Sequence, residues 1–282
     1  MTVGVFDKRN CSLGEGPLWH PLREQLFWFD INNKKMLSQR EGQALEWQFD
    51  DFVSAAGWVS RDQLLIASEM ELFLFDVETG KRAHLCPLEA ETGVTRSNDG
   101  RADPWGGFWI GTMGKNAEAG AGTIYRYFGG KLEMLYGDIT ISNSICFSPD
   151  KAFAYYTDTP TRQIMRQRLD AQGWPDGAAE VFIDLNDQGL NPDGSVVDAS
   201  GCLWNAQWGA SRVSCYGPDG AFKTAVEFPA EQISCPAFGG AGLTTLIATS
   251  ASEDMEGPST AQGRTYQRPI SAKGQMEHQV IL

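Results

Sequence analysis

Short apolar or alternating runs, each bounded by Gly, Asp, Asn or Pro, recur along the whole chain, whereas amphipathic runs with helical spacing are hard to find. The strongest runs are EQLFWFD around Trp28, DQLLIAS around Leu65, GGFWIGT around Trp109, AFAYYTD around Tyr155, GCLWNAQ around Trp204 and TTLIATS around Ile247. Their centres lie 37, 44, 46, 49 and 43 residues apart. This pattern predicts an all-β protein with a repeated unit of about 40–50 residues.

Turn sequences frame most of these runs. PLRE, SRD, DPWG, SPDK and DASG precede them, and several runs are followed by a further strand that ends in another turn, as in ELFLFDVETGK. Each repeat therefore indicates a four-stranded meander, and six of them in 282 residues predict a six-bladed β-propeller that occupies residues 1–282 as one domain. A two-sheet sandwich or two smaller β domains are the competing architectures, but no linker rich in Pro, Ser or Gly divides the chain.

Such a ring has to be closed, because an open first or last blade would leave a sheet edge unpaired. We expect closure by pairing of N- and C-terminal strands. The apolar runs at the two ends of the chain, TVGVFD and HQVIL, are expected to share one blade.

Composition and charge restrict the partners. The formal net charge of −13 would repel a phosphate backbone or an anionic membrane surface, so neither nucleic acid nor a membrane is expected as a partner. The start, MTVGVFDKRN, has charges where a secretory signal needs an apolar stretch. The six cysteines include no CxxC pair and lie in strand-like segments, which favours buried reduced thiols and a cytoplasmic location. The oligomeric state stays open.

Several familiar catalytic motifs are missing from the sequence. The three histidines, His20, His84 and His278, form no HExxH motif, and the chain has neither a GxSxG elbow nor a glycine-rich phosphate loop. Zinc-peptidase chemistry is therefore excluded, and nucleotide chemistry is not expected.

Four polar clusters recur near the starts of the predicted blades. They are GEGPLW around Glu15, RSNDG at 96–100, ISNS at 141–144 and NPDGS at 191–195. Equivalent positions in different blades of a propeller converge on the central channel, so the carboxylates of Glu15 and Asp193 are expected to meet there. The amide oxygens of Asn98 and Asn143 would join them, and such oxygen ligands suit a hard divalent cation such as Ca²⁺, Mg²⁺ or Mn²⁺.

The alternative to a metal site is that these Asn and Asp residues only stabilise turns. Asn and Asp in NDG and PDG are also common turn residues that bond their own backbone, and taken singly each is more often a turn than a ligand. Glu15 differs, because a carboxylate flanked by Gly and an apolar run would be partly buried and would need a partner or a metal. Arg96, two residues before Asn98, is most often a structural residue but could also donate two hydrogen bonds to a polar ligand.

These clusters resemble the family of senescence marker proteins, gluconolactonases and luciferin-regenerating enzymes. The matching stretches are LGEGPLWH at 13–20, RSNDGRADPWGGFWIGTM at 96–113, ISNSICFSPDKAFAYYTDT at 141–159, NPDGSVVDASGCLWNAQWG at 191–209 and CPAFGG at 235–240. The resemblance implies a six-bladed propeller, one divalent metal ion in the central channel, and hydrolysis of sugar lactones to aldonic acids. Ca²⁺, Zn²⁺, Mg²⁺ and Mn²⁺ all stay open as the metal.

The resemblance also implies roles for individual residues. Glu15, Asn143 and Asp193 match the metal-binding side chains of the family. The family often has Gly after the asparagine, where this chain has Ser144, which leaves the conformation of that turn open.

Three further residues match substrate contacts. Arg96 and Asn98 match the substrate-binding pair, and Glu118 in the loop KNAEAGA matches a further substrate-side acid. The leading hypothesis is a metal-dependent sugar lactonase in which the metal polarises the lactone carbonyl and Asp193 assists the attack of water. The alternatives are a phosphotriester or other ester hydrolase that uses the same metal site, and a non-catalytic calcium-binding propeller.

Overall fold

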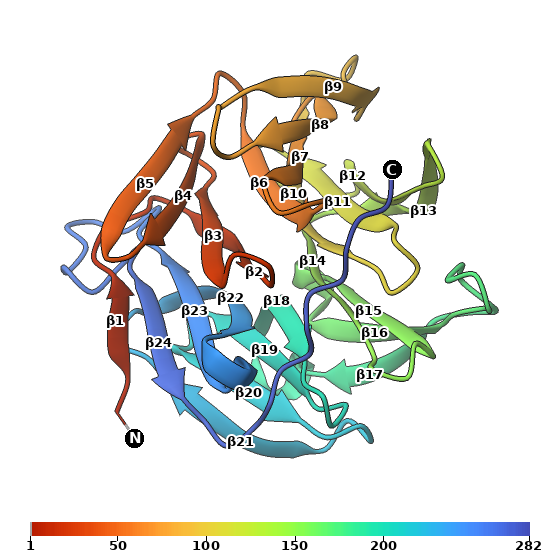
Figure 1. Ribbon diagram of the computed structural model, residues 1–282. Helices are drawn as coiled ribbons and strands as arrows, with labels where there is room; N and C mark the ends of the chain where they lie inside the picture. Colours follow the sequence, from red (N-terminus) through yellow and green to blue (C-terminus); the bar gives the residue numbers. More distant parts are fainter. Residues whose placement is uncertain (1) are drawn as a thin grey trace.

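The computed structural model describes residues 2–282, whose strands form six four-stranded antiparallel sheets arranged as the blades of a ring (Figure 1). The predicted all-β, six-bladed β-propeller is confirmed. Helical structure in this part of the chain is limited to three 3₁₀ turns, η1 (Thr159–Thr161), η2 (Asn186–Gln188) and η3 (Ala241–Leu243). None of them could cross a membrane.

Five blades are each built from four consecutive strands, and the first strand of each is the innermost. The first blade contains β2 (Gly14–His20), β3 (Gln25–Asp30), β4 (Lys35–Arg40) and β5 (Gln43–Gln48). The second contains β6 (Val53–Trp58), β7 (Gln63–Ser68), β8 (Glu71–Asp76) and β9 (Arg82–Pro87). The third contains β10 (Thr95–Ala102), β11 (Phe108–Gly114), β12 (Gly122–Phe128) and β13 (Lys131–Ile139). The fourth contains β14 (Ser142–Phe147), β15 (Phe153–Asp158), β16 (Gln163–Arg168) and β17 (Glu180–Asp184), and the fifth contains β18 (Asn191–Val197), β19 (Leu203–Trp208), β20 (Arg212–Tyr216) and β21 (Phe222–Glu227).

The sixth blade closes the ring. It combines β22 (Gln232–Gly239), β23 (Thr245–Ala251) and β24 (Thr265–Pro269) with β1 (Gly4–Asp7) as its outermost strand. In the antiparallel pair of β1 and β24, Val5 lies opposite Tyr266. Closure by N- and C-terminal strands is thus confirmed, but the expectation that the run HQVIL shares this blade is wrong. The partner of β1 is β24, a short and more polar strand whose sequence TYQRP gives little apolar signal.

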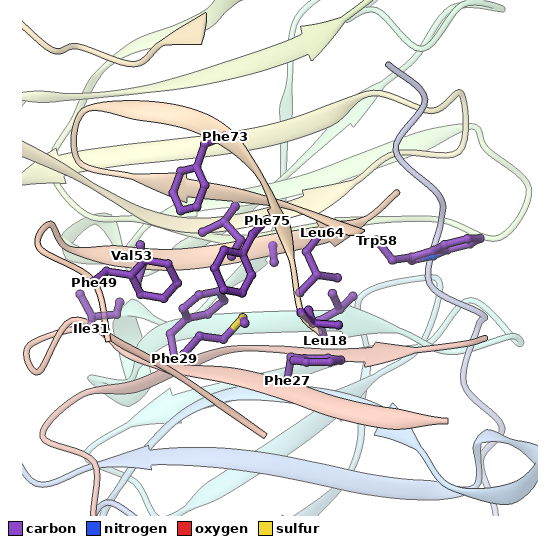
Figure 2. Close-up of a cluster of buried hydrophobic side chains, with 14 of the residues drawn as sticks. Leu18, Phe27, Phe29, Ile31, Phe49, Val53, Trp58, Leu64, Phe73 and Phe75 are labelled. Carbon is purple, nitrogen blue, oxygen red and sulfur yellow. The ribbon is translucent and has the colours of Figure 1, made fainter. Parts of the chain in front are cut away.

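The second strand of every blade carries the apolar run that sets the sequence period. Each of these strands is sheltered by a neighbouring strand on either side and by adjacent blades on its two faces, and all six residues of β3 are buried. Figure 2 shows one such core between the first two blades, where Phe27 and Phe29 pack near Leu64, Phe73 and Phe75. A strand buried on both faces has a continuous apolar sequence, which explains why these six runs stand out.

The C-terminal strap, residues 273–282, crosses one face of the ring (Figure 1). Its Val280 N–H donates to the Trp58 carbonyl (2.9 Å), and its Glu277 forms an ion pair with Arg101 on the innermost strand β10. Val280 is 1% exposed and lies so close to Gly57 that a Cβ atom there would stand 2.6 Å from the Val280 Cγ2. Val280 therefore packs against the second and third blades instead of extending the sixth sheet, whereas Ile281 and Leu282 are more than half exposed.

Removal of residues 277–282 is expected to lower the Tm by roughly 5 °C or more, as judged by differential scanning calorimetry. The truncation uncovers the apolar surface beneath Val280 and leaves Arg101, 11% exposed, without its carboxylate partner. Met276→Ala is the matched control, because this strap residue is 63% exposed and its loss should leave the Tm unchanged. An unaltered Tm in the truncated protein would contradict a stabilising role for the strap.

Candidate metal and substrate site

All six innermost strands carry a β-bulge at a corresponding position, where the strand has one residue more than its neighbour. The register shifts fall between Glu15 and Leu18, Val53 and Ala55, Ser97 and Gly100, Asn143 and Cys146, Pro192 and Ser195, and Ile233 and Pro236. A bulge bends its strand and re-aims the adjacent side chains. The polar clusters singled out in the sequence lie at four of these bulges, and the bulges turn them toward the channel.

One cavity of about 550 Å³ is lined by side chains from these four strands. Five of the six predicted site residues line it, namely Glu15, Arg96, Asn98, Asn143 and Asp193. Strand β10 runs from this cavity, at Arg96, to the strap on the other face, at Arg101. The strap therefore covers the far end of the channel and leaves the cavity open.

Glu118 does not line the cavity. It lies exposed in the loop after β11, where its carboxylate accepts hydrogen bonds from the Asn116 backbone N–H (3.0 Å) and from the Asn116 Nδ2 (2.9 Å). Asn116 itself is a lining residue. The structure thus places Glu118 behind the residue that faces the cavity.

A chain of hydrogen bonds connects three blades at the cavity. Arg96 Nη1 donates to Asn98 Oδ1 (2.7 Å), and Asn98 Nδ2 donates to Asn143 Oδ1 (3.2 Å). Asn143 Nδ2 in turn donates to the Thr159 hydroxyl (3.0 Å), whose own proton is donated to the Pro192 carbonyl (2.8 Å). Because that hydroxyl can only accept from Asn143, the Asn143 amide keeps its oxygen turned toward Asn98. An oxygen is the atom that a cation ligand has to present.

The pKa values of the two carboxyl groups in the proposed ligand set, Glu15 and Asp193, are both raised. Glu15 and Asp193 are each 5% exposed, and neither takes part in an ion pair within residues 2–282. Burial, followed by the charge of Asp99, raises the pKa of Glu15 to about 8. Burial, followed by the charge of Glu15, raises the pKa of Asp193 well above its usual range. Two such carboxyls can both be ionised only at a cost, unless a cation lies between them.

Asp193 also differs from the turn aspartates of the fold. Asp198, five residues later, accepts the backbone N–H groups of Ser200 (2.8 Å) and Cys202 (3.0 Å) through one oxygen and the Trp204 indole N–H (2.9 Å) through the other. Asp198 is thus saturated by local hydrogen bonds, whereas Asp193 is buried beside a second acid. Asp193 does accept the backbone N–H of Gly194, as a turn residue would, but this one bond does not account for its burial beside Glu15.

The donor chemistry of the cavity fits a divalent cation. Glu15, Asn143 and Asp193 offer only oxygen atoms, as a hard cation prefers. No three His, Cys, Asp or Glu side chains of residues 2–282 form a ligand group by themselves, so the Asn143 amide would have to complete the set.

The structure shows the conformation of the turn at Ser144, where the family often has Gly. Its φ of 60° is in the left-handed region that glycine adopts without strain, so the backbone after Asn143 has a glycine-like conformation. The Ser144 hydroxyl donates to the Asp193 carbonyl (2.5 Å) and accepts from the hydroxyl of Ser195 (3.0 Å). These bonds connect β14 to β18 beneath the cavity and offset the backbone strain.

Residues outside the repeated clusters complete the cavity, and sequence reasoning missed them. They are Asn32, Lys115, Asn116, Thr159, Trp208, Glu253 and Asp254, together with apolar lining residues. Most lie in loops, which differ between blades and follow no repeat. Nothing in the sequence around Glu253, SASEDMEG, distinguishes it from a solvated loop.

Comparison with known proteins shows the family to which the chain belongs. Residues 13–252 match the model of the SMP-30/gluconolactonase/LRE-like region. The chain belongs to this family. The resemblance noted in the four polar clusters is thereby confirmed over most of the sequence.

Two relatives of defined activity are similar over most of their length. An L-arabinolactonase of Azospirillum brasilense is 36% identical over 262 residues, which cover 88% of this chain and 83% of the relative. A 6-deoxy-6-sulfogluconolactonase of Pseudomonas putida is 33% identical over 259 residues, which cover 90% and 88%.

Solved structures show the same fold. The crystal structure of a calcium-binding protein, regucalcin, from Agrobacterium tumefaciens strain C58 superposes with a TM-score of 0.96 at 40% identity and covers 99% of this chain and 97% of its own. A luciferin-regenerating enzyme, at 24% identity, superposes with a TM-score of 0.92 over 100% of this chain and 99% of its own.

Proposed function

We propose that this protein is a metal-dependent lactonase that opens an aldono-lactone to the aldonic acid. The observation that carries the proposal is the convergence in one cavity of an oriented amide oxygen, the Arg96–Asn98 pair and two buried carboxylates that have no ion-pair partner within residues 2–282. The named activities of the two lactonase relatives support lactone hydrolysis, and the calcium-binding relative supports a divalent cation.

Glu15, Asn143 and Asp193 would hold the cation. When bound, the cation supplies a Lewis acid that polarises the lactone carbonyl. Asp193 takes the proton of the water that attacks the carbonyl carbon, since its carboxylate lines the cavity in which the lactone would lie. The ring C–O bond then breaks, and the same proton is available for the departing oxygen, which becomes a hydroxyl of the acid.

The remaining polar residues position the substrate. Arg96 and Asn98 are fixed against each other by a 2.7 Å hydrogen bond, so the remaining donors of the Arg96 guanidinium have a defined direction toward sugar hydroxyls. The Asn98 amide nitrogen already donates to the Ser142 carbonyl and to Asn143, so the amide oxygen is the Asn98 atom that can accept from a hydroxyl. Glu118 is proposed to act on the substrate side through Asn116, which it holds at the edge of the cavity.

The all-oxygen ligand set favours Ca²⁺, Mg²⁺ or Mn²⁺ over Zn²⁺. All six cysteines are free, which agrees with a reducing compartment and supports the proposed cytoplasmic location.

Hydrolysis of a panel of lactones, followed by pH-stat with the uncatalysed rate subtracted, tests the proposal. We expect catalysis on aldono-lactones, loss of at least 100-fold in rate after treatment with a chelator, and recovery when a divalent cation is added back. Full activity in the presence of chelator would contradict the metal dependence. Turnover of phosphotriesters alone would support the second hydrolase hypothesis, and cation binding without turnover of any ester would support the non-catalytic one.

A further inference from the structure

Glu253 enters the cavity from the loop that follows β23 in the closing blade. Its backbone N–H and that of Ser252 both donate to the Ser12 carbonyl, at 3.0 and 2.9 Å. Its carboxylate accepts a hydrogen bond from Asn32 Nδ2 (2.7 Å), and that amide nitrogen also donates to the Ser12 hydroxyl (3.0 Å). Backbone and side chain are thus both anchored to the first blade, and the carboxylate has a fixed place in the cavity wall.

Each cationic side chain that lines the cavity is opposed by the charge of at least one carboxylate. Among the described residues these cations are Arg96 and Lys115, and Lys115 forms an ion pair with Glu69. Burial lowers the pKa of Arg96, and Glu253 is the carboxylate that opposes this most. If a divalent cation balances Glu15 and Asp193, no positive charge is left over for an anionic group on the substrate.

Glu253 and Arg96 face the same cavity without forming an ion pair. An ionised Glu carboxylate only accepts hydrogen bonds, and an Arg guanidinium only donates them. A sugar hydroxyl does both, so hydroxyl groups can satisfy the two side chains together. A sulfonate, phosphate or carboxylate has only acceptors, and it would meet repulsion at Glu253.

We propose that Glu253 is a specificity-determining residue, which accepts a hydrogen bond from a substrate hydroxyl and discriminates against lactones that carry an anionic substituent. The inference rests on the proposed lactonase function and adds to it a residue that selects uncharged, polyhydroxylated substrates. Asn32 is the positioning residue that holds the Glu253 carboxylate in place.

The decisive measurement is the ratio of kcat/KM for a neutral aldono-lactone to that for its counterpart with a terminal sulfonate or phosphate. The wild-type protein is expected to prefer the neutral lactone. In Glu253→Gln, which keeps the size of the side chain and an oxygen for Asn32, this ratio should fall on the order of 10–100-fold, because the variant loses a charged acceptor and the repulsion together.

Two further variants distinguish the charge of Glu253 from the net charge of its loop and from the position of its side chain. Glu256→Gln removes one negative charge from the same loop at an exposed position that does not line the cavity, and the ratio should stay within about 2-fold of wild type. Asn32→Ala keeps the Glu253 charge but frees its side chain, so kcat/KM for the neutral lactone should fall while anionic lactones are still rejected. This second variant also keeps the inference testable if Glu253→Gln does not fold.

The outcomes distinguish this inference from the proposed function. Hydrolysis of the neutral lactone with the same ratio in wild type and Glu253→Gln, or a wild-type preference for the anionic lactone, overturns the role of Glu253 alone. If wild type hydrolyses neither lactone, the proposed function fails and the role of Glu253 falls with it. An equal shift in Glu256→Gln would mean that net charge, and not Glu253, sets the preference.

Discussion

Asp193→Asn is expected to lose both the bound divalent ion and activity on aldono-lactones. The substitution removes one of the two carboxylates of the proposed ligand set, which is also the proposed proton acceptor, while it keeps the shape of the side chain. Loss of a general base alone typically costs at least about 100-fold in kcat. Elemental analysis after dialysis should find about one ion per chain in wild type and close to none in the variant.

The metal-free variant should nevertheless fold. In the absence of a cation, the raised pKa of Asp193 means that ionisation of this carboxyl destabilises the folded state above its usual pKa, so its removal relieves that cost. The Tm in chelator is therefore expected to be no lower than that of wild type. Asp187→Asn, at an exposed position in η2, makes the same charge change away from the cavity and should retain both ion and rate. A full complement of metal in Asp193→Asn would refute the ligand assignment.

Arg96→Ala is expected to reduce kcat/KM for aldono-lactones on the order of 10–100-fold while metal content is retained. The guanidinium is a buried donor that faces the cavity, and the loss of a hydrogen bond from a charged group costs about 1.5–3 kcal/mol. The substitution also leaves Asn98 Oδ1 without its donor, so the two substrate contacts weaken together.

An unsubstituted aliphatic lactone serves as the control substrate for Arg96→Ala. It has no hydroxyls for Arg96 or Asn98 to bind, so its rate should fall much less than that of the sugar lactone. Equal losses on both substrates, or a loss of metal, would place Arg96 in the support of the metal site or of the fold instead of in sugar binding.

The architecture was predictable because each blade buries its second strand between neighbours on both faces. Segments such as QLFWFD in β3 and QLLIAS in β7 are therefore almost continuously apolar and stand out at the blade period. The closing strand was not predictable in the same way. β24 lies next to the outermost strand β1, where less of each strand is buried, and its sequence is less apolar than the run HQVIL that follows it.

Most of the candidate site could also be predicted, for a geometric reason. The innermost strands converge, so positions such as Glu15, Asn143 and Asp193, about 50 or more residues apart in the chain, come together as soon as the blades form. Glu118 shows the limit of this argument, because it lies in a loop and the structure places Asn116, not Glu118, at the cavity.

The amino-acid sequence by itself determined the blade period, the polar residues of the innermost strands and the family, since all three are repeated or contiguous patterns. Only the tertiary structure decided the rest. The orientation of the Asn143 amide depends on Thr159, the strap over the channel depends on Arg101 and Glu277, and the place of Glu253 depends on a loop anchored to another blade. Each of these is a contact between single residues of different elements. Such contacts leave no periodic trace in the sequence, because they are set by how the blades pack and not by the pattern of any one strand.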